Sequence, residues 1–268
     1  NITVVEVLDR ILPAEDIDIS NFALKSFEKQ GIKIKTSSTV KSLKTSKGKI
    51  SVQIETMAGS EEVSVEKVIL AVGIIGNTEN LGLENTSAKV SNGQLVVDKW
   101  GATHEPGLHA IGDLVGAPWL AHKASHEGVI CVERIAGLEN VHPLDSSNIP
   151  GCTYSRPQVA SVGLTQKLAE DAGHKVRVGH FPFIGNGKAI ALGEMDGFVK
   201  TVFDATTGEL LGAHMIGAEV TEMIQGYTVA RTLETTENEL LNTVFPHPTL
   251  SEMMHESVLD AFDRAIHI

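Results

Sequence analysis

A histidine held between two prolines and followed by a carboxylate is the stretch of this sequence best suited to chemistry. It reads Phe245-Pro246-His247-Pro248-Thr249-Leu250-Ser251-Glu252. Because each proline fixes its own φ and disfavours helical backbone in the residue before it, we expect His247 on a stiff, extended segment. Histidine transfers protons near neutral pH, and a carboxylate partner fixes its tautomer and raises its basicity. The spacing favours an acid–base pair of His247 and Glu252, with an ordinary surface turn as the alternative.

The same stretch carries a signal for the start of a helix. Thr249 and Glu252 have the spacing of a capping box, which predicts a helix from Thr249 to about Asp263. Glu252 would then lie one turn into the helix and could face the imidazole, the backbone of the cap, or both.

Two further carboxylates follow apolar stretches that predict strands. Residues 3–8 are rich in β-branched side chains and predict a buried strand with Glu6 near its end. An acidic residue at the tip of the second strand of a dinucleotide fold binds ribose hydroxyls, and an exposed terminal carboxylate is the alternative. Residues 108–113 predict a short buried strand with Asp113 at its carboxyl end, where open α/β sheets bind ligands; a helix or turn cap is the alternative.

A helix start follows Asp113. Pro118-Trp119-Leu120-Ala121-His122 predicts a helix that ends near Ala136, and its free backbone N–H groups could bind carbonyl or anionic groups of a ligand. His122, His126 and Glu127 could suggest a metal site on this helix. No second cluster accompanies them, so the sequence favours a solvated helix face and predicts no metal site.

The remaining elements alternate strands and helices. Before residue 100 the patterns predict a helix at 16–30 and strands at 32–35, 40–45, 50–55 and 65–72. Gly73 follows the last of these strands, and Asn92-Gly93 predicts a hairpin. A polar linker covers 137–150. Beyond it we expect strands at 158–162, 176–181, 197–204 and 210–216, and helices at 165–172, 218–232 and 237–242. Thr236 and Glu239 have the spacing of a capping box for the last of these helices. Helices gathered against an antiparallel sheet predict an α+β domain.

Composition excludes several classes of function. The chain has 268 residues, enough for about two domains, and a net charge of −12 without a basic stripe, so we expect no nucleic-acid partner. The longest apolar run, Val68 to Ile75, is too short to cross a bilayer, so we expect no membrane span. The two cysteines form no redox or metal motif, and Cys131 is expected in the core. Low cysteine use fits a reducing compartment, either the bacterial cytoplasm or the mitochondrial matrix of a eukaryote.

Six stretches match one family in order and in approximate spacing: 3–6, 68–73, 110–113, 120–124, 158–163 and 245–252. With them the chain resembles, over essentially its whole length, the C-terminal part of the dihydrolipoamide dehydrogenases, which are flavin-dependent pyridine nucleotide–disulfide oxidoreductases. The resemblance implies a truncated Rossmann-like α/β NAD-binding domain at 1–74, the tail of the FAD-binding domain at 75–148, and an α+β dimerisation domain at 149–268.

The resemblance also implies roles for single residues. His247 would be the catalytic acid–base and Glu252 its carboxylate partner. Glu6, Val40 and Gly73 would line the NAD site, with Glu6 selecting NAD over NADP. Asp113 would bind the ribityl hydroxyls of FAD, and the backbone of Trp119, Leu120, Ala121 and His122 would face the flavin ring. The family acts on lipoamide as a homodimer and serves the dihydrolipoyl acyltransferase of a 2-oxoacid dehydrogenase complex.

Some of the family's features are absent from this sequence. The N-terminal FAD-binding segment, the redox-active CxxxxC and the glycine-rich NAD turn are missing, so we expect a fragment that is inactive by itself. After Gly73 the family often has Arg and then Pro-Asn, whereas here Ile74-Ile75-Gly76-Asn77 follows. Two alternatives stay open. The chain could act as a dimerisation and docking module whose acidic surface meets a basic partner, or it could belong to a related disulfide reductase such as glutathione reductase. The acidic Glu6 favours NAD and so argues against the latter.

Overall fold

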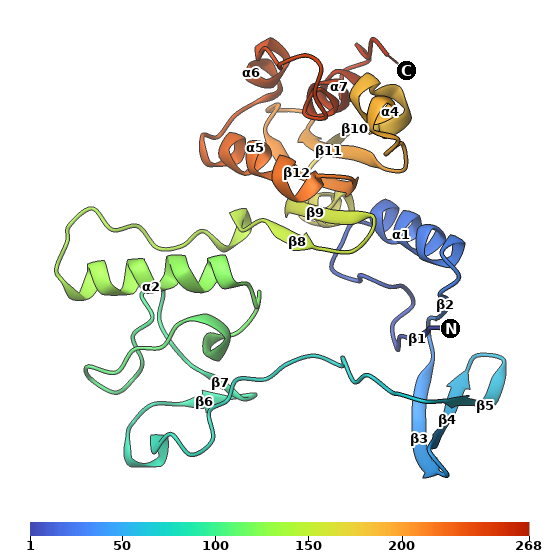
Figure 1. Ribbon diagram of the computed structural model, residues 1–268. Coiled ribbons are helices and arrows are strands. Elements are labelled where there is room, and N and C mark those ends of the chain that lie inside the picture. The colour runs from blue at the N-terminus through green and yellow to red at the C-terminus, as the bar shows by residue number, and fades with distance from the viewer. Residues whose placement is uncertain (268) are drawn as a thin grey trace. The chain divides into compact units, whose positions relative to one another are not determined.

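A five-stranded antiparallel sheet organises the second half of the chain (Figure 1). The structure, a computed structural model, describes residues 1–267. The strands occur in the order β10-β11-β12-β9-β8, with bounds β8 Gly151–Thr153, β9 Gln158–Gly163, β10 Val176–Pro182, β11 Phe198–Asp204 and β12 Leu210–Gly217. The four strands predicted from the sequence are confirmed. β8 was not predicted, because three residues are too few to show alternation.

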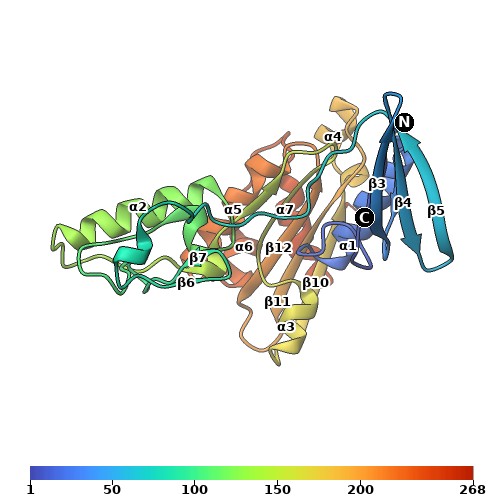
Figure 2. The same cartoon turned by 90° about the horizontal axis from the view of Figure 1, so that it is seen from below.

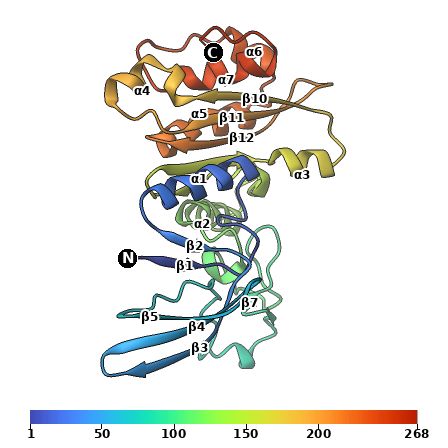
Figure 3. The same ribbon diagram turned by 90° about the vertical axis from the view of Figure 1, so that its right-hand side faces the viewer.

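Helices cover both faces of this sheet. Helices α5 (Val220–Thr232) and α7 (Glu252–Ala261) pack on one face, and α1 (Ile17–Lys29) packs on the other, as Figures 1 and 3 show. Strands β11 and β12 are buried along their whole length. Because the sheet is covered on both faces, side chains on both sides of these strands are buried, including the polar Lys200, Thr201, Asp204 and His214.

Three shorter helices complete this region: α3 (Gln166–Asp171), α4 (Gly187–Leu192) and α6 (Glu237–Asn242). Helices α3 and α6 were predicted, and α6 begins with the expected capping box of Thr236 and Glu239. Helix α4 was missed because its six residues lie between glycines and look like a loop.

The N-terminal segment packs with the same sheet. Strand β1 (Thr3–Val5) pairs in parallel with β2 (Lys33–Lys35), and α1 connects them. The predicted helix at 16–30 is confirmed, with Asp16 as its N-cap. The predicted buried strand at 3–8 is shorter than expected and is not buried, since it ends at Val5 and Val4 is 39% exposed. A meander of β3 (Thr39–Ser46), β4 (Lys49–Thr56) and β5 (Gly59–Val65) follows (Figure 2).

The predicted buried strand at 65–72 is wrong. Strand β5, which was not predicted, ends at Val65, and no helix or strand is assigned between there and Gly73. Ile69, Leu70 and Val72 are 90%, 80% and 85% exposed. A strand requires a neighbour for its backbone hydrogen bonds, and no strand in the described part of the chain pairs with these residues. Apolar, β-branched composition alone is therefore insufficient to form the strand.

The chain divides into two units, one formed by 1–69 with 150–268 and the other by 70–149. The second unit contains the hairpin of β6 (Val90–Ser91) and β7 (Gln94–Leu95) around Asn92-Gly93, as predicted, and helix α2 (Ala121–Ile135). The predicted strand at 108–113 is wrong, because only an isolated bridge from His109 to Ala102 forms before the 3₁₀ turn η2 (Gly112–Val115). Among residues 1–267, no helix is long and apolar enough to cross a membrane.

Candidate functional site

His247 and Glu252 form a hydrogen-bonded pair on the loop that leads into α7. The distance from His247 Nδ1 to Glu252 Oε1 is 2.9 Å. The imidazole is 81% exposed, whereas the carboxylate is only 28% exposed. Because a carboxylate can only accept, Nδ1 carries the proton of this bond, and Nε2 of the neutral ring is left as a base. The arrangement can therefore accept a proton from an incoming group at Nε2.

Glu252 also holds the backbone of the loop. Its Oε2 accepts a hydrogen bond from the Thr249 amide at 2.8 Å, while Thr249 Oγ1 donates to the Pro246 carbonyl at 2.6 Å. Helix α7 begins at Glu252, so the predicted start at Thr249 is wrong. The Thr249 hydroxyl is engaged with Pro246 and with Ser251 Oγ (2.9 Å), so only half of the expected capping box forms.

The charge of Glu252 is stabilised by these contacts. Burial raises the pKa of the carboxyl, but hydrogen bonds from the Thr249 amide and from His247 outweigh it and hold the pKa below its ordinary value of 4.5. Glu252 is thus ionised near neutral pH. An ionised partner on Nδ1 favours the imidazolium that forms when the ring accepts a proton.

Side chains from other elements fix the position of this loop. The buried amide of Asn186 donates to the Thr249 carbonyl at 3.1 Å and also caps α4 through the Ala189 amide at 2.9 Å. The buried Tyr227 hydroxyl donates to the Met254 carbonyl at 2.9 Å and anchors α7. The sequence did not reveal Asn186 as a support, since it is 63 residues from the loop.

Neither cysteine in residues 1–267 is an activated thiol. Cys131 and Cys152 are both free, and burial raises the pKa of each thiol above its ordinary value. Cys131 is buried, as expected for a core residue.

Glu6 follows β1 at the end of the two-stranded sheet and is hydrogen-bonded to the segment that precedes Val40. The backbone amide of Glu6 donates to the Lys35 carbonyl. The Glu6 carbonyl accepts from the backbone amide of Ser38, which is two residues before Val40. Glu6 Oε1 accepts from the Leu8 amide at 2.9 Å. A carboxylate at the end of a strand suits sugar hydroxyls, so this corner fits the ribose of a dinucleotide. The chain has no glycine-rich turn to hold the phosphates of that dinucleotide.

Gly73 lies in the other unit, at residues 70–149. It adopts a positive φ of 117°, and a Cβ added there would meet no atom within 4 Å. The residue can thus let a ligand approach its backbone closely, although nothing in the structure relates it to Glu6.

Asp113 and the start of α2 form a second group of ligand-binding candidates, within one unit. Asp113 is exposed on the turn η2, beside the buried Gly112. The turn lies against α2, since a Cβ on Gly112 would be 3.2 Å from the Ala124 Cβ. An exposed carboxylate accepts from hydroxyl groups, as the ribityl chain of a flavin requires.

The start of α2 offers donors for the same ligand. Leu120 is the N-cap and makes no side-chain cap hydrogen bond, and the first turn of α2 contains Ala121 and His122. Backbone N–H groups in the first turn of a helix have no acceptor within the helix. Trp119 is 40% exposed beside it. Backbone donors at a helix start suit the carbonyl oxygens of a flavin ring. The residues present therefore fit FAD.

The residues considered as metal ligands on α2 do not come together. Glu127 is ion-paired with Lys123 at 2.9 Å. Within residues 1–267, no group of three or more His, Cys, Asp or Glu side chains has the geometry to hold a metal ion.

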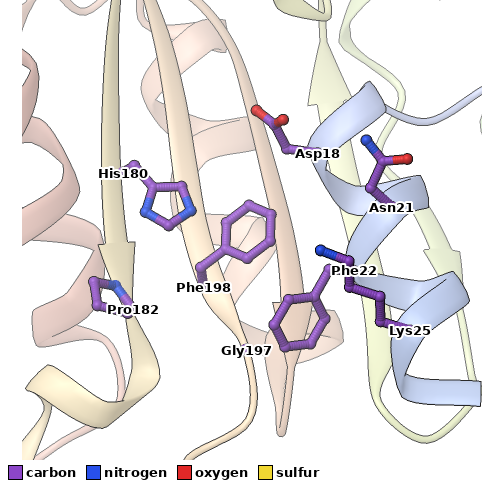
Figure 4. A pocket seen from close by; sticks show the side chains of 8 residues that line it. All are labelled: Asp18, Asn21, Phe22, Lys25, His180, Pro182, Gly197 and Phe198. Atoms are coloured by element: carbon purple, nitrogen blue, oxygen red, sulfur yellow. The ribbon is translucent and has the colours of Figure 1, made fainter. Parts of the chain in front are cut away.

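One hollow lies between α1 and strands β10 and β11 (Figure 4). It has a volume of about 360 Å³, and its aromatic wall contains His180 stacked on Phe198 with ring centroids 4.4 Å apart. Burial lowers the pKa of His180. None of the residues singled out from the sequence lines it, and no sequence motif pointed to it.

Comparisons with known proteins match both halves of the chain to one protein family. Residues 1–128 match a model of pyridine nucleotide-disulphide oxidoreductases, and residues 149–258 match a model of the dimerisation domain of those proteins. The chain is 56% identical over 269 residues to a dihydrolipoyl dehydrogenase of Zymomonas mobilis, and 55% identical over 268 residues to one of Rhizobium etli. These matches cover 99% and 100% of this chain but 57% and 56% of the relatives, so the chain spans little more than half their length.

A solved structure has the same fold. LpdA from Mycobacterium tuberculosis matches with a TM-score of 0.87 and 28% identity, over 96% of this chain and 55% of that one. A mutant form of RclA, a flavoprotein disulfide reductase from Escherichia coli, matches with a TM-score of 0.87 and 25% identity, over 97% of this chain and 58% of that one.

Proposed function

Because this chain belongs to the pyridine nucleotide-disulphide oxidoreductases, we propose that it is the C-terminal part of a dihydrolipoyl dehydrogenase. The whole enzyme oxidises protein-bound dihydrolipoamide and passes the electrons through FAD to NAD. The hydrogen bond between His247 and Glu252 carries this proposal, because oxidation of a dithiol needs a base. The relatives are bacterial, which supports the cytoplasm as its location.

His247 acts on the substrate thiol. A thiol becomes a good nucleophile only as the thiolate, so the imidazole Nε2 takes the proton before the sulfur attacks the redox disulfide. Glu252 stabilises the imidazolium and keeps the ring in one tautomer through Nδ1. This attack breaks the redox disulfide and releases one of its sulfurs as a thiolate, which takes the proton from the imidazolium. The neutral imidazole then takes the proton of the second lipoyl thiol, whose sulfur attacks the mixed disulfide, displaces the other enzyme sulfur as a thiolate and closes the lipoyl disulfide.

The cofactors are held by residues of different domains. FAD, when bound, accepts the electron pair from the reduced disulfide. Asp113 holds its ribityl chain, and the backbone from Trp119 to His122 faces its ring. From the resemblance to the family, Glu6 and Val40 of one unit would contact NAD, and Gly73 of the other unit is assigned to the same cofactor. In this proposal residues 1–74 belong to the NAD-binding domain, 75–148 to the FAD-binding domain and 149–268 to the dimerisation domain; Ile268 lies outside the described residues.

The partners follow from the same assignment. The match to a dimerisation domain supports a homodimer, in which His247 of each subunit serves the disulfide of the other. The net charge of −12 favours a basic docking domain on the dihydrolipoyl acyltransferase of a 2-oxoacid dehydrogenase complex.

The assignment of His247 is tested in the protein extended to the full length of its relatives. His247→Gln should lower the rate of dihydrolipoamide oxidation by about 10²–10⁴-fold, since glutamine cannot accept the proton. NADH oxidation by ferricyanide, which takes electrons from the flavin directly, should continue, and the flavin spectrum should be unchanged. His142→Gln, an exposed histidine of the linker, is the control. Undiminished lipoamide turnover in His247→Gln would exclude this role for His247.

The 268-residue chain without the rest of the enzyme is a second case. Here we propose a dimerisation and docking module without catalytic activity, supported by the match of residues 149–258 to a dimerisation domain and by the net charge of −12. The purified chain should be colourless and should show no NADH oxidation, and light scattering should give the mass of a dimer. A yellow preparation with flavin absorbance would contradict this.

A further inference from the structure

An ion pair of one buried and one half-buried side chain lies against the turn that carries Asp113. Lys123 and Glu127 are one turn apart on α2, with Nζ and Oε1 2.9 Å apart. Their side chains are 7% and 20% exposed. Charged side chains on a helix usually point into water, so the burial of this pair needs an explanation.

Both side chains reach from α2 to the backbone of the turn η2. Lys123 Nζ donates to the Gly116 carbonyl at 3.0 Å and to the Gly112 carbonyl at 3.4 Å. Glu127 Oε2 accepts from the Gly112 amide at 2.8 Å. The pair therefore binds the backbone at both ends of the segment that contains Asp113, while leaving the Asp113 side chain exposed.

The turn needs such support. Gly112 and Gly116 have positive φ values of 71° and 110°, and glycine has the greatest backbone freedom of any residue. A buried ion pair contributes little net stability compared with apolar residues of similar size, because desolvation offsets its attraction. Its contacts instead favour a role in fixing the geometry of the turn.

We propose that Lys123 and Glu127 are positioning residues that hold the Gly112–Gly116 turn so that Asp113 meets the ribityl hydroxyls of FAD. This inference rests on the proposed function, which places FAD at Asp113. It predicts that FAD affinity depends on two side chains that act through the backbone on either side of Asp113 and need make no contact with FAD themselves.

The experiment uses the protein extended to the full length of its relatives, stripped of flavin and titrated with FAD, with flavin fluorescence as the readout. Lys123→Met and Glu127→Ala should each raise the dissociation constant of FAD about tenfold or more. Glu127→Gln keeps an acceptor for the Gly112 amide, so it should raise the dissociation constant of FAD by less. This variant provides the test if the other two do not fold. His126→Gln, an exposed neighbour on α2, should leave the constant within about twofold.

A double-mutant cycle with Asp113→Ala separates positioning from general destabilisation. Asp113→Ala should itself weaken FAD binding, and in that background Lys123→Met should weaken it little further, because the lysine acts through Asp113. Full additivity of the two changes, or unaltered FAD affinity in Glu127→Gln and Lys123→Met, would overturn the inference. Unaltered affinity in Asp113→Ala would instead remove the proposed FAD site, and the inference with it.

Discussion

The ammonium of Lys200 in β11 lies 2.8 Å from Asp16 Oδ1 at the N-terminus of α1, and both side chains are 1% exposed. Asp16 Oδ1 also accepts from the backbone amide of Asp18, and Asp16 Oδ2 accepts from the backbone amide of Gln166 at 3.2 Å. Burial raises the pKa of Asp16, but the hydrogen bond from Lys200 and that from the Asp18 amide hold it below 3.8. The pair fastens the N-terminal helix to the sheet of the C-terminal region.

Removal of Lys200 should strongly destabilise this unit. Lys200→Met leaves the Asp16 carboxylate buried without its cation, so the free energy of unfolding in urea should fall by about 3–5 kcal/mol. Lys29→Met is the matched control, because Lys29 also joins α1 to the C-terminal region, through Asp196 at 3.5 Å, but both side chains are more than 70% exposed. The control should lose less than about 1 kcal/mol. Equal losses of unfolding free energy in the two variants would show that the buried pair stabilises the protein no more than the exposed pair does.

Gly179 should tolerate no side chain. A Cβ at this position in β10 would lie 1.8 Å from the Ser257 carbonyl of α7, so Gly179→Ala must push the helix away from the sheet. We expect a loss of several kcal/mol in the free energy of unfolding, on the order of an overpacked core. Gly187→Ala at the start of α4 is the control, since its Cβ would meet nothing within 4 Å. It should be neutral or slightly stabilising, because alanine favours helix.

The stabilising contribution of Asp204 should be lost at acid pH. The hydrogen bond from His174 Nδ1 at 2.6 Å, with those from the Thr206 and Thr207 amides, lowers the pKa of Asp204 to about 2. A carboxyl whose pKa is lower in the folded than in the unfolded state stabilises the folded protein when it is ionised. This contribution is fully present above the unfolded-state pKa of 3.8 and is lost as the pH falls toward 2. The difference in melting temperature between the wild type and Asp204→Asn should therefore be largest above about pH 5 and shrink below about pH 4. A difference that stays constant from about pH 6 to about pH 2.5 would count against this account.

Glu252→Gln should separate the two tasks of Glu252. Glutamine keeps an oxygen for the Thr249 amide but loses the charge that stabilises the imidazolium. In the full-length protein we expect dihydrolipoamide oxidation to fall by about 10²-fold. Melting temperature and flavin content should stay close to wild type. A rate close to wild type would show that the carboxylate serves only the backbone of the loop.

Local signals in the sequence predicted many of the elements correctly. The amphipathic pattern of 16–30 predicted helix α1, and the capping box of Thr236 and Glu239 is present at the start of α6. Such signals depend on contacts within one or two turns, so they need no tertiary information. The five-residue spacing of His247 and Glu252 belongs to the same class, and the structure brings these side chains to 2.9 Å, although their catalytic role stays a prediction.

The failures had different causes, and only the first of them involves a distant partner. The apolar run at 65–72 has the composition of a strand, but a strand exists only when another strand pairs with its backbone. Thr249 has the sequence of a cap, but its hydroxyl binds Pro246, and the helix begins three residues later. Short elements such as β8 and α4 carry too few residues to show a period.

The sequence by itself therefore determined the family, most of the longer helices and strands, and the pairing of His247 with Glu252. Only the tertiary structure showed that Lys200 meets Asp16 across 184 residues, that Asn186 supports the loop of His247, and that Lys123 and Glu127 bind the turn of Asp113. The physical reason is the range of the interactions. Caps and amphipathic faces are encoded within a few residues, whereas buried ion pairs and supports for loops depend on how distant segments pack.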